Sequence, residues 1–173
     1  STGLRPSEPT KLRIEDIDLK NKVLHVKETK FTKERYVPFD VTVFKRLSNY
    51  KSWIEHKLGV LSPKSYFFYT TDGVPISARS LSSAFNKIRC CIDAKPLGYT
   101  HVRLYDFRHT TACNTIYRWM KQGIDVNSNL FTLSTYLGHV KPEDTYWYLS
   151  SNPRILELSC SKFEEMFGGD DCE

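Results

Sequence analysis

The sequence predicts a mainly helical α+β domain with a small antiparallel β-sheet. In several long segments apolar residues recur every three to four positions, as on the buried face of a helix. Two short runs of β-branched and aromatic residues flank a polar, basic segment, as in a hairpin with a long tip. A chain of 173 residues with 40% hydrophobic content can bury one substantial core, so we expect a single domain over 1–173.

The amino-terminal part is expected to carry the sheet. A short helix begins at Arg5 and ends near Pro9, and 12–18 then alternates apolar and polar residues before a turn. The hairpin strands are expected over 23–27 and 35–39. Because the chain opens with no helix or strand before its first residues, we also expect a truncation at the amino terminus.

The rest of the chain is expected to be helical apart from one strand. Asp40 and Gly59 bound a first helix with an apolar stripe over 43–58, and a short buried strand follows over 66–69. Ser77 caps a second helix whose stripe is Leu81, Ala84, Phe85, Ile88 and Ile92. Further helices are expected over 105–122, 130–137, 142–149 and 155–167.

The composition indicates a soluble, cytoplasmic protein. No stretch approaches the roughly 18 uninterrupted apolar residues of a membrane span, and no secretory leader opens the chain. The five cysteines lack the paired spacing of a zinc site, so we expect reduced thiols and no bound metal. The net charge of +5 suits a polyanionic partner but does not identify one.

Tyr148 is the most informative single residue. It lies in an aromatic cluster whose members are more often core residues than reactive ones. Thr145 and Tyr148 share a helix face because they are three positions apart, whereas Tyr146 lies roughly 200° from Tyr148 about the axis. Only one of the two tyrosines can therefore face a given site.

Cationic residues elsewhere in the chain change the interpretation of Tyr148. Tyr105 and Arg108 are three positions apart at a helix start, where backbone N–H groups and the helix dipole already favour a phosphate. Arg5 adds a second arginine. Taken alone, each arginine is usually a solvated or ion-paired surface group. The functional interpretation therefore depends on the order of the motifs along the chain.

That order resembles the catalytic domain of the tyrosine recombinase (phage integrase) family, from Thr2 to about Ser151. The motifs are Thr-Gly-Leu-Arg-x-Ser-Glu over 2–8, a hairpin lysine, Asp-Phe-Arg-His-Thr over 106–110, Leu-Gly-His over 137–139 and Thr-x-x-Tyr over 145–148. The resemblance implies the fold of that domain and a site-specific recombinase or integrase that cleaves and rejoins DNA through a 3′-phosphotyrosyl intermediate. The resemblance includes transposon-encoded members of the family.

The resemblance also implies a role for each residue. Tyr148 would be the nucleophile, and the forked guanidinium groups of Arg5 and Arg108 would bind the nonbridging oxygens of the phosphate. Lys30 would protonate the departing 5′ hydroxyl, and His139 would hydrogen-bond the phosphate.

Four further residues have rival or supporting roles. Lys27 and Lys33 are rivals of Lys30 for the proton-donating role. Glu8 matches an acid that orients an arginine or histidine, and His109 matches a structural position.

One departure from the family pattern concerns the proton of Tyr148. Where the family usually has histidine, three residues before the second arginine, this chain has Tyr105. A phenol with an ordinary pKa near 10 can hold a hydrogen bond but is a poor base at neutral pH. The resemblance therefore leaves the general base for Tyr148 unassigned.

Three other functions stay open. A type IB topoisomerase shares the chemistry, and a DNA-binding relative without strand transfer would keep the fold. The third is a metal-dependent nuclease, which the neighbouring carboxylates Asp16 and Asp18 suggest, although solvated carboxylates are the commoner explanation for such a pair.

The resemblance implies double-stranded DNA as the partner, a homotetramer on DNA, and no cofactor or metal. A core-binding domain, which such proteins carry before the catalytic domain, is absent from 1–173. Within the tetramer 155–167 would dock in cis or in trans. Basic side chains that read phosphates would be Lys27, Lys33, Arg79, Lys87 and Arg89.

Overall fold

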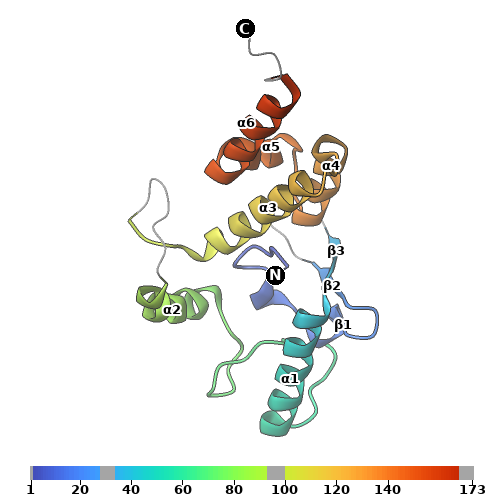
Figure 1. Cartoon of the computed structure of the whole chain (residues 1–173). Helices are drawn as coiled ribbons and strands as arrows, with labels where there is room; N and C mark the ends of the chain where they lie inside the picture. Colours follow the sequence, from blue (N-terminus) through green and yellow to red (C-terminus); the bar gives the residue numbers. More distant parts are fainter. Residues whose placement is uncertain (1, 28–33, 93–99, 168–173) are drawn as a thin grey trace, which may run out of the picture. The chain divides into compact units, whose positions relative to one another are not determined.

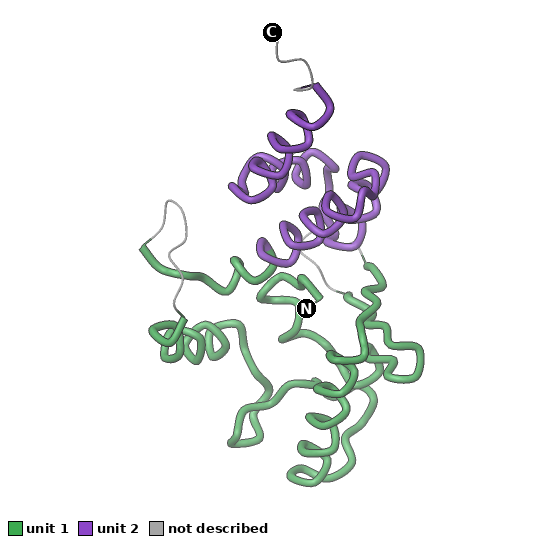
Figure 2. Tube along the Cα trace, in the orientation of Figure 1, with its two compact units in different colours: residues 1–108 green, residues 109–173 purple. Residues whose placement is uncertain are grey.

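The computed structural model describes residues 2–27, 34–92 and 100–167, which form six α-helices, three short 3₁₀ helices and one sheet of three strands (Figure 1). Two compact units divide the chain, residues 1–108 and residues 109–173 (Figure 2). This mainly helical architecture with a small antiparallel sheet confirms the predicted fold class. In the part of the chain that the structure describes, no helix is long and apolar enough to cross a membrane.

The sheet of the first unit is antiparallel, in the order β1-β2-β3. Its strands are β1 (Ile17–Asp18), β2 (Val23–Val26) and β3 (Arg35–Pro38). Leu24 pairs with Val37, and both are buried, so this pair faces the core. The predicted hairpin is therefore confirmed, with each strand one residue shorter than expected.

The alternating segment 12–18 is mostly not strand. Its middle is a 3₁₀ helix, Ile14–Asp16, and only the last two residues join the sheet as β1. The Asp16 carboxylate accepts a hydrogen bond from the backbone N–H of Arg13 at 2.9 Å, which closes a local turn and competes with strand pairing. A second 3₁₀ helix, Pro9–Lys11, stands where a short helix over 5–10 was expected.

Helix α1 (Val41–Leu58) is capped as the sequence predicts. The Asp40 carboxylate accepts from the backbone N–H groups of Thr42 and Val43, and Gly59 ends the helix with a φ of 81°. The strand expected over 66–69 is wrong: only isolated bridges form there. The reason is that the Tyr50 hydroxyl of α1 accepts from the backbone N–H of Tyr69 at 2.8 Å, taking the place of a strand partner.

Helix α2 (Ala78–Ile88) begins at the Ser77 cap, as expected, in a capping box with Ser80. Its predicted stripe is only partly buried, because Phe85 is in the core whereas Ile88 is 59% exposed. Arg79 and Lys87 are on the exposed part of the same helix. Helix α2 therefore combines one core contact with a basic, solvent-facing side.

Four helices complete the fold, and α3 begins in the first unit and continues into the second. They are α3 (Leu104–Lys121), α4 (Val126–Leu137), α5 (Glu143–Ser150) and α6 (Pro153–Phe167). All four were predicted, α4 being longer at its start than expected. The core of the second unit brings together Ala112, Cys113, Ile116, Leu130, Leu133, Leu137, Tyr148 and Ile155. All four helices thus contribute to a single apolar cluster.

Candidate functional site

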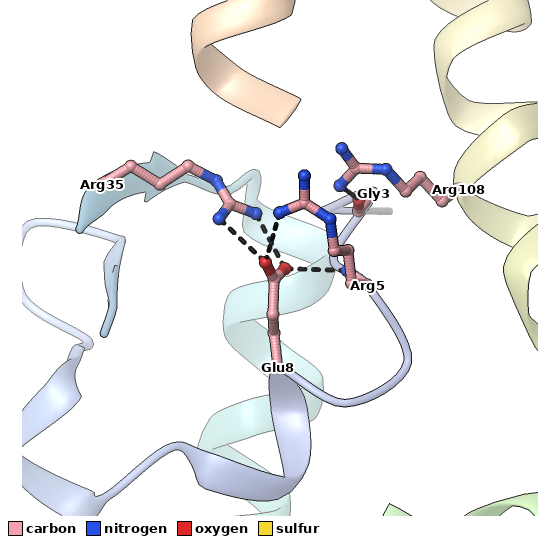
Figure 3. Close-up of polar contacts among 5 residues, drawn as sticks. All are labelled: Gly3, Arg5, Glu8, Arg35 and Arg108. Atoms are coloured by element: carbon pink, nitrogen blue, oxygen red, sulfur yellow. Dashed lines mark hydrogen bonds and ion pairs between the residues drawn. The ribbon is translucent and has the colours of Figure 1, made fainter. Parts of the chain in front are cut away.

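The first unit contains a network of charged side chains around Glu8 (Figure 3). Glu8 is only 3% exposed, and its carboxylate accepts hydrogen bonds from two arginines. Arg35 donates from both terminal nitrogens, Nη1 to Oε1 at 3.0 Å and Nη2 to Oε2 at 2.8 Å. Arg5 donates from Nη1 to Oε1 at 3.0 Å and from its backbone N–H to Oε2 at 2.8 Å. Both carboxylate oxygens are therefore satisfied by cationic or backbone donors.

The ionisation of Glu8 follows from these contacts. Burial raises the pKa of the Glu8 carboxyl group, but the hydrogen bonds from Arg35 and from the backbone and side chain of Arg5 outweigh burial. The net result is a pKa below the ordinary value of 4.5. Glu8 is thus an anion at neutral pH and holds the two guanidinium groups by charge as well as by geometry.

Arg108 is the largest fully buried side chain of the described residues, at 1% exposure. Its Nη1 donates to the carbonyl oxygen of Gly3 at 2.8 Å (Figure 3). Gly3 has a φ of 60°, a backbone conformation that residues with a Cβ rarely adopt. The segment that carries Arg5 is therefore tied to the second predicted arginine through a glycine two positions earlier.

Tyr105 lies in the first turn of α3 and is 46% exposed. The start of this helix is closed by Asp106, whose carboxylate accepts from the backbone N–H of Arg103 at 2.7 Å and from the Arg103 guanidinium at 2.8 Å. The phenol of Tyr105 is consequently displayed at a helix N-terminus, where an anion is favoured. The position suits a hydrogen-bond donor to a phosphate.

In the second unit, His139 is placed by the end of α4. Gly138 ends α4 in the left-handed conformation, with a φ of 72°, and the backbone N–H groups of Gly138 and His139 donate back to the last turn of the helix. The His139 Nδ1 atom is 2.8 Å from the Oγ1 atom of Thr145, which is fully buried on α5. The Thr145 hydroxyl therefore holds the imidazole at Nδ1.

Tyr148 lies one helical turn after Thr145 and is 4% exposed. Its ring stacks on His139, with a centroid distance of 6.0 Å and an interplanar angle of 17°, and also contacts His109 at 5.2 Å. Tyr146, by contrast, is 51% exposed. The difference in burial agrees with the predicted helical phase. Within its own unit, the structure brings together Thr145, Tyr148 and the two histidines.

The lysine expected to act as proton donor, Lys30, lies outside the described residues, as does its rival Lys33. The other rival, Lys27, is described. Its Nζ atom is 2.7 Å from the Oδ1 atom of the buried Asp16, and the hydrogen bond to Asp16 raises the pKa of Lys27 above its ordinary value. A lysine bound in this way is a weaker acid. This contact disfavours Lys27 as the proton donor.

The two acids that suggested a metal site have separate partners. Asp16 binds Lys27, whereas Asp18 accepts hydrogen bonds from the backbone and side-chain amide of Asn21. Hydrogen bonding to Asn21 holds the pKa of Asp18 below its ordinary value. Each carboxylate is therefore accounted for by a local contact with a neighbouring side chain.

Two residues of these networks were not singled out from the sequence. The sequence indicated position 35 only as the start of an expected strand, and the place of Arg35 opposite Glu8, 27 positions away, follows from the fold alone. Thr145 was used only for its spacing to Tyr148. No local signal in the sequence marks Arg35 for burial, because arginine is rarely buried unless it has a charged partner, and that partner is distant in the sequence.

Comparison with known proteins gives a consistent set of similarities. The phage integrase family model matches residues 1–154. Two putative integrase/recombinases of Sinorhizobium fredii are 31% and 35% identical, each over 94% of this chain and about half of the relative, 52% and 51%. The tyrosine recombinase XerC of Corynebacterium glutamicum is 28% identical over 91% of this chain and 46% of the relative.

The structural similarities extend over nearly the whole chain. The XerA recombinase superposes with a TM-score of 0.72 at 22% identity, covering 94% of this chain and 54% of XerA. The Tn1549 transposon integrase, in complex with a circular intermediate DNA, gives 0.68 at 20% identity, covering 95% of this chain and 55% of the integrase. At these identities the likeness establishes a shared fold. The chain spans about half the length of the curated relatives that it matches.

Proposed function

The chain belongs to the phage integrase family, and on this premise we propose that it is the catalytic domain of a site-specific DNA recombinase or integrase. Its partner is double-stranded DNA, its working assembly is a homotetramer on that DNA in the cytoplasm, and it requires neither a cofactor nor a metal. The recombinase and integrase names of its relatives support this activity, and the DNA complex of the Tn1549 integrase supports the partner.

Tyr148 is the proposed nucleophile. Its phenolic oxygen attacks the phosphorus of one strand, the bond to the 5′ oxygen breaks, and a 3′-phosphotyrosyl link remains. The freed 5′ hydroxyl of a partner strand then attacks the same phosphorus and releases the tyrosine. Because one ester replaces another at each step, the reaction needs no ATP. The well-packed ring of Tyr148 supports this role, since a nucleophile must be held in one orientation.

Arg5 and Arg108 are the proposed phosphate ligands. Attack adds negative charge to the nonbridging oxygens, and guanidinium groups held in advance stabilise that charge without reorganisation. The observation that carries the proposal is the burial of Arg108 at 1% exposure together with its hydrogen bond to Gly3. Burying a guanidinium group is costly, so its placement beside the Arg5 turn favours a functional explanation.

Three residues handle protons and orientation in this proposal. Lys30 protonates the departing 5′ oxygen, which is the role that the ion pair with Asp16 disfavours for Lys27. His139 hydrogen-bonds the phosphate, and the Thr145 hydroxyl orients its ring. Tyr105 donates a hydrogen bond rather than accepting the proton of Tyr148, because a phenol is a poor base at neutral pH.

A nicked suicide duplex built from the DNA that flanks the gene tests the proposal. Loss of the short downstream fragment that bears the freed 5′ hydroxyl traps the covalent intermediate, which is resolved from free protein by denaturing electrophoresis. The wild-type protein is expected to form the adduct, and Tyr148→Phe is expected to bind the same DNA without forming it. Tyr146→Phe, on the exposed side of the same helix, is the matched control and retains the adduct. An adduct that persists in Tyr148→Phe would assign the nucleophile elsewhere.

A further inference from the structure

We infer that Arg35 is a positioning residue of the phosphate site: it offsets the charge of Glu8 and so leaves Arg5 available as a cation. This inference rests on the proposed function, in which Arg5 binds the phosphate. Arg35 itself need not touch DNA. It acts through Glu8, which it contacts with both terminal nitrogens.

The geometry places Glu8 between the two arginines (Figure 3). Each carboxylate oxygen accepts one bond from Arg35 and one from Arg5, at distances between 2.8 and 3.0 Å. Arg35 approaches from the start of β3, and Arg5 from the turn that precedes the 3₁₀ helix Pro9–Lys11. The carboxylate is thus a bridge between the sheet and the segment that carries the phosphate ligand.

The charges of the three side chains explain why one arginine would not suffice. Two guanidinium groups and one carboxylate together carry a net charge of +1. Without Arg35, Arg5 and Glu8 would form a neutral pair, and an incoming phosphate would have to compete with Glu8 for Arg5. Because Glu8 and Arg35 are 3% and 8% exposed, solvent screens this competition only weakly.

Arg35 also fixes the position of Glu8. Its backbone belongs to β3, where Arg35 pairs with Val26 of β2, so the guanidinium group extends from an ordered strand. Two parallel hydrogen bonds restrain both the place and the tilt of the carboxylate, whereas a single ammonium contact would leave it free to rotate. Loss of Arg35 is therefore expected to displace Arg5 as well as to neutralise it.

A purely structural ion pair predicts a different outcome. In that case removal of Arg35 would lower the stability of the protein, and any loss of activity would be independent of the charge on the DNA. In the proposed role, the loss depends on that charge, because Arg5 acts on the nonbridging oxygens. A methylphosphonate at the scissile position replaces one charged oxygen by a neutral methyl group and separates the two explanations.

The experiment measures single-turnover adduct formation on nicked duplexes with a phosphodiester or a methylphosphonate at the scissile position. Arg35→Met is expected to slow cleavage of the phosphodiester about 10- to 100-fold, the factor that corresponds to hydrogen bonds to a charged group. The defect is expected to shrink on the methylphosphonate. Arg35→Lys, which keeps the charge but not the fork, should fall between wild type and Arg35→Met.

Two further variants control the interpretation. In a Glu8→Gln background, adding Arg35→Met should cause little further loss, because the charge that Arg35 offsets is already gone. Arg13→Met is the matched control: Arg13 is another arginine of the first unit, held by the Lys64 carbonyl at 2.6 Å, and its loss should leave both rates unchanged. Thermal unfolding identifies any variant that is not folded at the assay temperature, in which case Arg35→Lys replaces Arg35→Met in the comparison.

Each result decides the role of Arg35. Wild-type rates in both Arg35 variants, or an equal loss on both substrates, overturn it while leaving the proposed function intact. A wild-type protein that forms no adduct overturns the proposed function and the role of Arg35 together. A loss confined largely to the charged substrate, and absent from the Glu8→Gln background, supports it.

Discussion

The hydrogen bond between Thr145 and His139 can be tested by removing the Thr145 hydroxyl alone. Thr145 is fully buried, and its Oγ1 atom lies 2.8 Å from the His139 Nδ1 atom. Valine has nearly the same shape as threonine and the same branching at Cβ, so Thr145→Val removes the hydrogen bond without opening a cavity. We expect His139 to lose its fixed ring orientation and the tautomer that the bond selects.

The stability cost should be small and can be matched by a control. A net hydrogen bond contributes about 0.5–1.5 kcal/mol, so Thr145→Val should lower the free energy of unfolding by about 1 kcal/mol. Thr145→Ser keeps the hydroxyl but deletes one buried methyl group, which also costs about 1 kcal/mol. The two variants should therefore be equally stable but differ in whether His139 keeps its partner.

The activity of the two variants should diverge. Single-turnover adduct formation is expected to slow about tenfold in Thr145→Val, the equivalent of about 1.4 kcal/mol, and to change little in Thr145→Ser. Urea unfolding measures the stabilities, and ¹⁵N NMR of the imidazole reports the tautomer of His139. The reasoning fails if Thr145→Val cleaves at the wild-type rate with an unchanged tautomer, or if Thr145→Ser loses as much activity as Thr145→Val.

Two further predictions concern Glu8 and the hairpin lysine. Because the pKa of Glu8 is lowered in the folded state, the ionised carboxylate stabilises the protein above its ordinary pKa of 4.5, and this stabilisation disappears as the pH falls below that value. Glu8→Gln should therefore flatten the decline in the free energy of unfolding between neutral pH and about pH 3. An unchanged pH profile of the free energy of unfolding would contradict this prediction. Lys30→Met should abolish cleavage of a normal duplex but not of a duplex with a 5′-bridging sulfur, because the sulfur leaves without a proton. Lys27→Met should cleave both duplexes. The reverse pattern would assign the general acid to Lys27.

Local signals made most of the helices predictable from the sequence. Asp40 and Ser77 each cap a helix through contacts with the next few residues, so neighbouring positions contain the whole explanation. The hairpin was predictable for the same reason, because the β-rich runs pair with each other in sequence order.

Contacts between distant residues account for the differences. The segment 66–69 has the composition of a strand, but the Tyr50 hydroxyl, 19 positions away, binds the Tyr69 backbone and replaces a strand partner. The apolar stripe of α2 continues to Ile88, yet this side chain is exposed because nothing in the described part of the first unit covers it. Periodicity shows which residues share a face, but not how far a neighbouring element extends over that face.

In the candidate site, too, local signals predicted some features and contacts between distant residues determined the others. The motifs indicated Arg5, Arg108, His139 and Tyr148 as chemical groups, and the burial of Tyr148 beside an exposed Tyr146 follows from helical phase. The partners that hold these groups were not visible in the sequence. Arg35 reaches Glu8 only because β3 folds beside the turn that contains it, a contact 27 positions apart that no local pattern encodes.

The place of the Tyr148 ring within the core of the second unit has a genetic consequence. Phenylalanine fills the same apolar volume, and its codons differ from those of tyrosine by a single nucleotide. On the proposed chemistry, one point mutation would silence strand transfer and leave a folded protein, whereas truncation of the ring to alanine would also open a cavity and lower the free energy of unfolding by about 3–5 kcal/mol. Loss of the reaction without loss of the fold is thus an accessible evolutionary route for this domain, towards a protein that occupies DNA without cutting it.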